Sequence, residues 1–215
     1  MSPNSDVRTS LRRAILDGTY TPGVRLVEAE LAEEFSASRF VLRNALIQLE
    51  SEGLIEIQPN RGARVRKVTP EEAVEISEVR QAVESLIAAR AAKNVTDDQI
   101  AFLTQLGADM QEAVDENAVV AYSELNTALH STLRNIAAHE NGNRILEQIN
   151  GQMVGHQFQL FLVPGRPSTS LPEHLEIIRS VCARNPEAAR AAMFAHVGSV
   201  VATLASFAEK SSQGS

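Results

Sequence analysis

The sequence predicts a mainly α-helical protein: an N-terminal winged helix-turn-helix with a small β-hairpin, followed by an all-α bundle of six helices. Three observations lead to this fold class. Apolar residues recur at helical spacing through most of the chain, alternation typical of strands is confined to residues 54–68, and charge is unevenly distributed along the chain. These features predict two domains with different partners.

The uneven charge places the domain boundary. Residues 1–68 hold ten basic and nine acidic side chains, a net charge of +1, whereas residues 69–215 hold ten and eighteen, a net charge of −8. The interpretation is a DNA-binding domain over residues 1–68, a helical domain over residues 69–210 and a tail over residues 211–215.

The first domain reads as three helices and a hairpin. Gly18 ends the first helix, Ser38 is placed to cap the third, and a turn around Gly62 joins two alternating strands. The expected elements are Val7–Asp17, Glu28–Phe35, the helix after Ser38 to Glu52, and strands Leu54–Gln58 and Ala63–Val68. This order is typical of a helix-turn-helix followed by a wing.

The second domain reads as six helices, most of them opened by a capping residue or a proline. Thr69 and Pro70 suit the first two positions of a helix, and Thr96 precedes two acids that favour a helix N-terminus. The expected helices are Thr69–Ala92, Thr96–Asp115, Ala118–Ala138, Asn141–Val163, Leu171–Asn185 and Pro186–Ala208. Helices of this length predict a bundle.

Composition excludes several classes of protein. The single cysteine, Cys182, rules out an internal disulfide. The longest apolar candidate, Val197–Ala208, is interrupted by small polar residues and is shorter than the roughly 18 residues of a membrane span. With no basic-then-apolar leader, we expect a cytoplasmic protein without a membrane partner.

The helix after Ser38 is a candidate DNA-reading helix. Its apolar residues share one face, while Phe40 and Arg43 point the other way and Arg39 lies at the flank. Arginine can donate two hydrogen bonds to guanine or neutralise phosphate. In the hairpin Arg61 and Gly62 form a basic tip that can approach double-stranded DNA closely. The alternative is a solvated amphipathic helix with surface arginines.

A histidine constellation is the second motif. Asn126 and His130 are four residues apart and share a helix face, whereas His174 and His196 lie on the two following helices. Three imidazoles and one oxygen can converge inside a bundle and hold zinc, nickel or another first-row divalent metal ion. The alternative is three separate histidines, each hydrogen-bonded within its own surroundings.

The first domain resembles the winged-helix domain of the GntR superfamily of bacterial transcription regulators. The resemblance covers residues 8–66 and rests on Ile15-Leu16-Asp17-Gly18, Pro22 to Glu28, Ser38-Arg39, Ala45-Leu46 and Arg61-Gly62 in order. It implies a homodimer that binds a palindromic operator, with Ser38, Arg39, Arg43 and Gly62 touching DNA. Phe40 stands where threonine is frequent, which changes the expected operator sequence.

The second domain resembles the FCD-type ligand-binding domain of the FadR-like branch, in its shorter six-helix form. The resemblance rests on Glu78 to Glu84, Leu125 to His130, Glu173-His174 and Ala192 to His196. Many members bind a divalent metal with Asp and three His, and the matching positions are Asn126, His130, His174 and His196. The amide in place of a carboxylate implies weaker metal binding and a more positive site.

The resemblance also implies a ligand for the helical domain. Arg80 would face the cavity and bind the carboxylate of a small organic acid, with Arg134 as a second cation; alternatively, Arg80 pairs with Glu84, four residues on. We therefore expect a transcription regulator, a repressor controlled by that acid. A regulator that senses the metal itself, or a metal-dependent enzyme, are the alternatives, although no acid or nucleophile is placed for catalysis.

Overall fold

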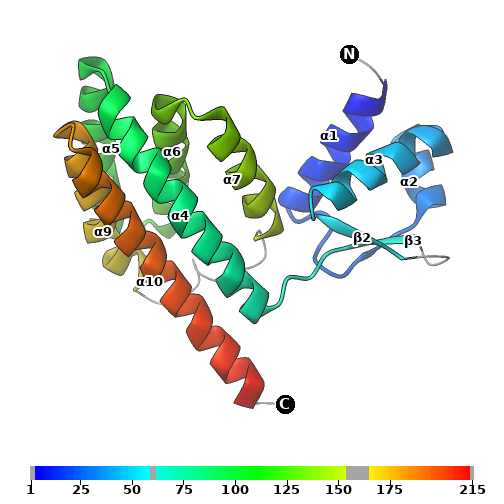
Figure 1. Cartoon of the computed structure of the whole chain (residues 1–215). Helices are drawn as coiled ribbons and strands as arrows, with labels where there is room; N and C mark the ends of the chain where they lie inside the picture. Colours follow the sequence, from blue (N-terminus) through cyan, green and yellow to red (C-terminus); the bar gives the residue numbers. More distant parts are fainter. Residues whose placement is uncertain (1–2, 59–61, 154–164, 214–215) are drawn as a thin grey trace. The chain divides into compact units, whose positions relative to one another are not determined.

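The computed structural model describes residues 3–58, 62–153 and 165–213, and the chain divides into two compact units (Figure 1). One comprises Met1–Thr69 with Glu147–Gly155, and the other comprises Pro70–Leu146 with His156–Ser215. The predicted fold class is confirmed: helices dominate, the one small sheet among the described residues lies in the first unit, and the second unit is helical.

The first unit is a winged helix-turn-helix. Its elements are α1 (Pro3–Leu16), β1 (Arg25–Leu26), α2 (Glu28–Glu34), α3 (Arg39–Ser51), β2 (Ile55–Gln58) and β3 (Gly62–Val65). The three strands form an antiparallel sheet in the order β1-β3-β2, with Arg25 opposite Arg64 and Ile55 opposite Val65. Strand β1 was not predicted, because two residues are too short for an alternation pattern.

One apolar cluster holds this unit together. Leu11 of α1, Leu42 and Leu49 of α3, Leu26 of β1 and Ile55 of β2 are all almost fully buried in it. The α3 leucines recur at helical spacing, so the opposite face of α3 remains at the surface. The core therefore fixes which side of α3 is available for binding.

Among the described residues, the second unit contains five whole helices and the first half of α7, whose residues from Glu147 on belong to the first unit. They are α4 (Pro70–Asn94), α5 (Asp97–Asp115), α6 (Val119–Ala137), α7 (Glu140–Gln152), α9 (Arg166–Cys182) and α10 (Pro186–Gln213). Helix α10 packs along α4 and α9, and α4 also packs against α6 (Figure 1). The extension expected after residue 153, to Val163, lies outside the described residues.

Two helix boundaries differ from the predictions by five residues, and α1 begins four residues early, at Pro3. Helix α9 begins at Arg166, ahead of the predicted Leu171, because Pro167 suits the first turn and Pro172 is accommodated inside the helix. Helix α10 continues to Gln213, into the expected tail. By contrast, Thr96 caps α5 as predicted. Its side chain accepts from the Gln99 backbone N–H, and the Gln99 side chain accepts from the Thr96 backbone N–H, which completes a capping box.

The apolar part of helix α10 is longer than predicted from the sequence. The stretch Pro186–Glu209 is long and apolar enough to cross a membrane by length and composition, with a mean hydropathy of 1.6. The run Val197–Ala208 considered in the sequence is only the C-terminal part of this stretch. Core helices of soluble proteins pass the same test, and α10 packs against α4 and α9.

Candidate functional site

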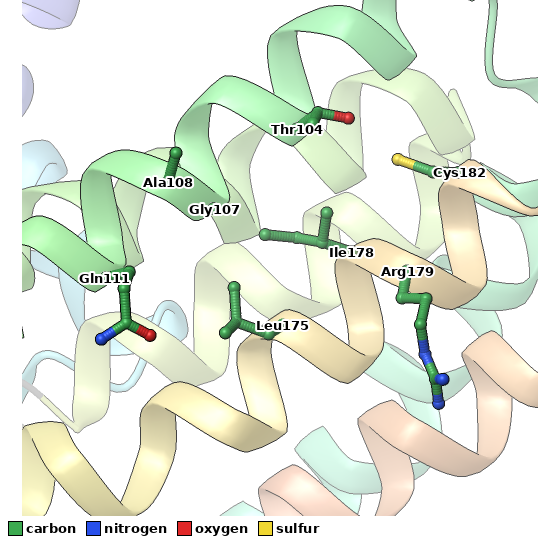
Figure 2. Close-up of a pocket in the computed structure, with 8 residues that line it drawn as sticks. All are labelled: Thr104, Gly107, Ala108, Gln111, Leu175, Ile178, Arg179 and Cys182. Atoms are coloured by element: carbon green, nitrogen blue, oxygen red, sulfur yellow. The ribbon is translucent and has the colours of Figure 1, made fainter.

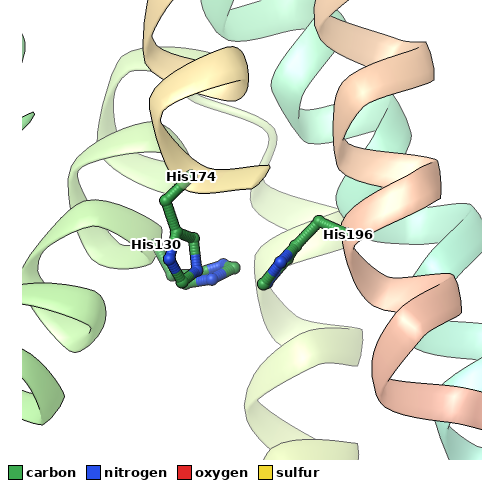
Figure 3. A group of neighbouring side chains, drawn as sticks. All are labelled: His130, His174 and His196. Atoms are coloured by element: carbon green, nitrogen blue, oxygen red, sulfur yellow. The ribbon is translucent and has the colours of Figure 1, made fainter. Parts of the chain in front are cut away.

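Three histidines from three helices converge inside the second unit. His130 lies on α6, His174 on α9 and His196 on α10, and one ring nitrogen of each lies within 4.8 Å of the others (Figure 3). His174 and His196 are 2% and 5% exposed. The structure thus brings together residues far apart in the sequence, at a spacing suited to one shared metal ion.

Each imidazole uses its Nδ1 atom for a contact with the protein. His196 Nδ1 lies 2.9 Å from Glu173 Oε2, and His130 Nδ1 lies 2.9 Å from Glu84 Oε2. Because an ionised carboxylate only accepts, His196 Nδ1 carries the hydrogen of this bond and His196 Nε2 keeps a lone pair. His174 Nδ1 lies 2.8 Å from the Tyr122 hydroxyl. Such partners orient the histidines that ligate metals.

The second ring nitrogen of His174 is available to bind a metal ion. Its Nε2 atom is buried and has no hydrogen-bond partner among the described residues. A buried polar atom without a partner is costly, and a divalent ion that accepts the Nε2 lone pairs of three imidazoles would remove that cost. The donor set, three imidazoles with their other nitrogens already engaged, therefore fits a first-row divalent ion.

Burial favours the neutral form of two of the imidazoles, those of His174 and His196. Burial lowers the pKa of His174 well below its ordinary value, and the neighbouring His196 and His130 lower it further. Burial also lowers the pKa of His196, although the hydrogen bond to Glu173 opposes that shift. A neutral imidazole is the form that binds a metal, so the cluster is ready for an ion near neutral pH.

Glu84 links Arg80 to the cluster. Arg80 donates from Nε and Nη2 to Glu84 Oε1 at 3.1 and 2.8 Å, and both side chains are largely buried. Burial raises the pKa of Glu84, but Arg80 and His130 outweigh it and hold this pKa well below its usual range. Of the two roles considered for Arg80, the structure contains the pair with Glu84.

The other predicted site residues lie on α6. Asn126 is half-buried, one turn before His130, and its side chain makes no hydrogen bond to another described residue. Arg134 is half-buried one turn after His130. The structure brings together His130, His174 and His196, whereas Asn126 and Arg134 lie beside them on the same helix as His130.

Sequence reasoning missed the partners of the imidazoles. Glu84, Glu173 and Tyr122 each contact one histidine. Glu173 precedes His174 in the chain yet bonds His196 on another helix, and Tyr122 is distant in sequence from His174. The pairing depends on how the helices pack, for which spacing along the chain carries no signal.

A separate groove lies between α5 and α9. Its volume is about 390 Å³, and none of the three histidines lines it (Figure 2). The lining residues are Thr104, Gly107, Ala108, Gln111, Leu175, Ile178, Arg179 and Cys182. Burial raises the pKa of the Cys182 thiol, which keeps it protonated and little reactive near neutral pH.

In the first unit, α3 presents an exposed polar face. Ser38 caps the helix by accepting from the Val41 backbone N–H at 3.3 Å, and Arg39, Phe40 and Arg43 are exposed. Phe40 is 74% exposed, which is unusual for an aromatic side chain without a partner. This face, with its cap and two arginines, is suited to the major groove of DNA.

The tip of the wing is described only in part. Gly62 has φ +82°, a conformation that side chains other than glycine rarely adopt. Arg64 on β3 is exposed, whereas Arg66 lies 4.0 Å from Glu56. Arg61, the other predicted wing residue, lies outside the described residues.

Two protein families match the chain, one in each part. Residues 3–65 match the bacterial regulatory proteins of the gntR family, and residues 75–199 match the FCD domain. The transcriptional repressor RspR of Escherichia coli K12 is 30% identical over 194 residues, which cover 90% of this chain and 85% of RspR. The repressor NanR of Salmonella arizonae is 29% identical, covering 86% of this chain and 77% of NanR.

Solved structures have the same fold. Escherichia coli McbR/YncC superposes with a TM-score of 0.75 at 21% identity, covering 96% of this chain and 98% of that one. A GntR transcriptional regulator from Rhodococcus sp. RHA1 has a TM-score of 0.71 at 22% identity, covering 96% and 99%. At this identity the likeness concerns the fold.

Proposed function

Because the chain belongs to the GntR family of transcription regulators and carries an FCD domain, we propose that it is a cytoplasmic, homodimeric repressor controlled by a small organic acid that binds beside a metal ion. The family and the named relatives are regulators, so the chain is a DNA-binding regulator and not an enzyme. The proposal concerns the metal, the acid, the homodimer and the direction of control.

The unpartnered Nε2 of His174 is the observation that carries the metal site. With Nδ1 of each histidine facing Glu84, Tyr122 or Glu173, the Nε2 atoms of His130, His174 and His196 would hold the ion. Zinc suits this set, and nickel is the second choice. The Asn126 amide, one turn from His130, would supply a neutral oxygen.

The position of Arg80 refines how an acid would bind. Arg80 already donates from Nε and Nη2 to Glu84 Oε1, so one N–H of Nη2 and the two of Nη1 are left for a carboxylate. The ion would therefore contribute most of the attraction for the acid, with Arg80 Nη1 and Arg134 as supporting donors. A bound acid would favour one arrangement of α6, α9 and α10 and so change operator affinity.

For DNA we propose contacts from Ser38, Arg39, Phe40 and Arg43 on α3 and from Arg61 and Gly62 on the wing. The exposure of the described α3 side chains supports this assignment. A dimer would present two copies of α3 to the two halves of a palindrome.

A second candidate is a regulator for which the metal is itself the signal. The contacts of His196 with Glu173 and of His130 with Glu84 favour this candidate. They orient the imidazoles before a metal ion binds, so the ion could bind without an organic acid. Fluorescence anisotropy of the DNA upstream of the protein's own gene separates the two. Zinc alone would change DNA affinity if metal is the signal, whereas the organic-acid model requires a small carboxylate added to the zinc-loaded protein.

The test has a clear contrary outcome. We expect at least one member of a panel of small carboxylates to weaken DNA binding by the zinc-loaded protein, and Arg80→Ala to reduce this response while retaining DNA binding. If neither zinc nor any carboxylate of the panel alters DNA affinity, the proposed control is wrong. If carboxylates act equally with and without zinc, the acid does not bind at the metal.

A further inference from the structure

The last turns of α7 lie against the C-terminal end of α3. The part of α7 from Glu147 on belongs to the same compact unit as α3. In it, Gln148 Nε2 donates to the Ser51 carbonyl at 3.4 Å, and Gln152 Nε2 donates to the Glu52 carbonyl at 3.3 Å. Gln148 and Gln152 are four residues apart, so their side chains share a face of α7. Two amides therefore meet two consecutive carbonyls at the end of the candidate DNA-reading helix.

These contacts complete the cap of α3. The last four carbonyls of an α-helix have no partner inside the helix. At the end of α3, the Gly53 N–H donates to the Glu50 carbonyl at 2.9 Å, and the Leu54 N–H donates to the Leu49 carbonyl at 3.0 Å. This pair of bonds, around a glycine with φ +72°, is a Schellman motif and satisfies two of the four carbonyls. The two amides of α7 satisfy the two that remain.

The Gln152 amide also contacts the chain that leaves the wing. Its Oε1 atom accepts a 3.0 Å hydrogen bond from Arg66 Nη1. Arg66 directly follows β3, and its backbone N–H donates to the Leu54 carbonyl at 2.9 Å. An amide suits this place, because its nitrogen donates to one partner while its oxygen accepts from the other. One side chain of α7 thus joins the end of α3 to the end of β3.

Glycines allow α7 to approach this closely. A β-carbon at Gly53 would lie 2.4 Å from Gln152 Nε2. A β-carbon at Gly151 would lie 3.1 Å from Leu54 Cδ2. Met153, which follows α7, is fully buried. The contact is therefore part of the packing of this unit, although the sequence places α7 far from α3.

We propose that Gln148 and Gln152 are positioning residues for DNA binding. A recognition helix and a wing read one site only when both fit the same stretch of duplex, so their relative orientation matters. The two amides hold the end of α3, and Gln152 holds the end of β3 through Arg66. This inference rests on the proposed contacts of α3 and the wing with DNA, and it requires neither the metal nor the acid.

Binding of two DNA duplexes by the full chain tests this role. One duplex is selected from a random pool by the wild type, and the other is a scrambled sequence of the same length. Gln148→Ala with Gln152→Ala should weaken binding to the selected duplex about tenfold, which corresponds to one lost base contact. Binding to the scrambled duplex should be unchanged, because it depends on charge. Fluorescence anisotropy measures both.

Two glutamines on α5 provide the matched control. Gln105 and Gln111 are exposed, and each donates to an aspartate four residues on. Gln105→Ala with Gln111→Ala should bind both duplexes as the wild type does. If the α7 double variant binds the selected duplex as tightly as this control, the positioning role is wrong. Equal weakening on both duplexes would also overturn it, because the amides would then only stabilise the fold.

Gln152→Glu separates positioning from stability. The carboxylate keeps an acceptor for Arg66 but cannot donate to the Glu52 carbonyl. We expect its melting temperature to stay near that of the wild type, because an ion pair with Arg66 offsets the lost bond. Its binding to the selected duplex should fall as far as that of Gln152→Ala. Wild-type binding by Gln152→Glu would show that the contact with the end of α3 does not matter for DNA.

Arg43→Ala keeps this inference and the proposed function apart. If Arg43→Ala binds the selected duplex as the wild type does, the α3 contacts proposed for DNA are wrong and the positioning role falls with them. If Arg43→Ala is weakened and the α7 double variant is not, the positioning role alone is overturned. Weakening in both, with the scrambled duplex bound normally by the α7 double variant, is the expected result.

Discussion

The two ring nitrogens of His174 have different surroundings. Its Nδ1 contacts Tyr122 while its Nε2 is buried without a partner. We expect His174→Ala to abolish stoichiometric zinc binding, because one of three imidazoles is lost. Elemental analysis and calorimetric titration measure this. His139→Ala, which removes a ring that accepts from Gly142 N–H at the start of α7, should bind zinc normally.

Asn126 tests the fourth position. Asn126→Asp should tighten zinc binding by about tenfold, because a carboxylate adds charge to the coordination sphere. Unchanged affinity in this variant would place the fourth ligand elsewhere, and stoichiometric zinc in His174→Ala would contradict the site as a whole.

Glu84 predicts a pH dependence of stability in the metal-free protein. Its pKa is well below the usual range when folded, because Arg80 and His130 outweigh burial. The stability it contributes is therefore present above the unfolded pKa of about 4.3 and is lost as pH falls below that value. Between pH 7 and pH 3 the wild type should lose about 1–2 kcal/mol more than Glu84→Gln in urea unfolding. Equal losses in the two proteins would show that Glu84 is not held ionised.

Ala138 ends α6 in a left-handed conformation, with φ +46°. Because a β-carbon is strained there and glycine is not, Ala138→Gly should stabilise the protein by about 0.5–1 kcal/mol. Ala183, which ends α9 with φ −74°, is the matched control: Ala183→Gly should be neutral or destabilising. Thermal unfolding measures both, and a destabilised Ala138→Gly would contradict the argument.

At the scale of elements, α3 carries the DNA prediction. Arg43 is exposed, and Ala45 on the opposite side of α3 is buried. Arg43→Ala should cost about 1–3 kcal/mol of operator binding if it contacts a base edge, and binding should weaken as salt rises. Arg190→Ala, an exposed arginine of α10, should bind DNA as the wild type does. Equal losses in both variants would indicate a general charge effect.

Strong local signals explain which elements could be predicted. Ser38 and Thr96 cap helices through their own side chains, so the starts of these two helices could be predicted from the local sequence. Strand β1 forms only because Arg25 and Leu26 pair with β3, a contact that is not local. Helix α9 has Pro167 in its first turn, a residue predicted to lie in a loop, and therefore Pro172, predicted to lie in the first turn, is inside the helix.

The same limit applies to the candidate site. The resemblance to known domains selected His130, His174 and His196, and the structure brings these residues together. The spacing of the three histidines along the chain did not indicate that Glu84 stands between Arg80 and His130. Which charged side chains face each other across two helices depends on how each helix is rotated about its axis. A rotation by one residue, about 100°, would bring different side chains into contact.

At the scale of the whole molecule, metal binding should be visible as stability of the second unit. A ligand that binds only the folded state stabilises it by about 2.7 kcal/mol at a hundredfold excess over its dissociation constant. We expect zinc to raise the melting temperature of the wild type in calorimetry, and a chelator to reverse this. Zinc should have no such effect on His174→Ala, and an equal shift in both proteins would indicate binding elsewhere.

The origin of the three imidazoles also bears on kinetics. His130, His174 and His196 belong to separate helices, and two of the rings are almost fully buried. An ion held there would leave only after one helix had swung away from the others. Its release would then follow the opening rate of the protein and be independent of chelator concentration once the chelator is in excess. Such a regulator would retain its ion through short periods in which metal is scarce. Its metal content would then change slowly, whereas the bound acid would exchange quickly.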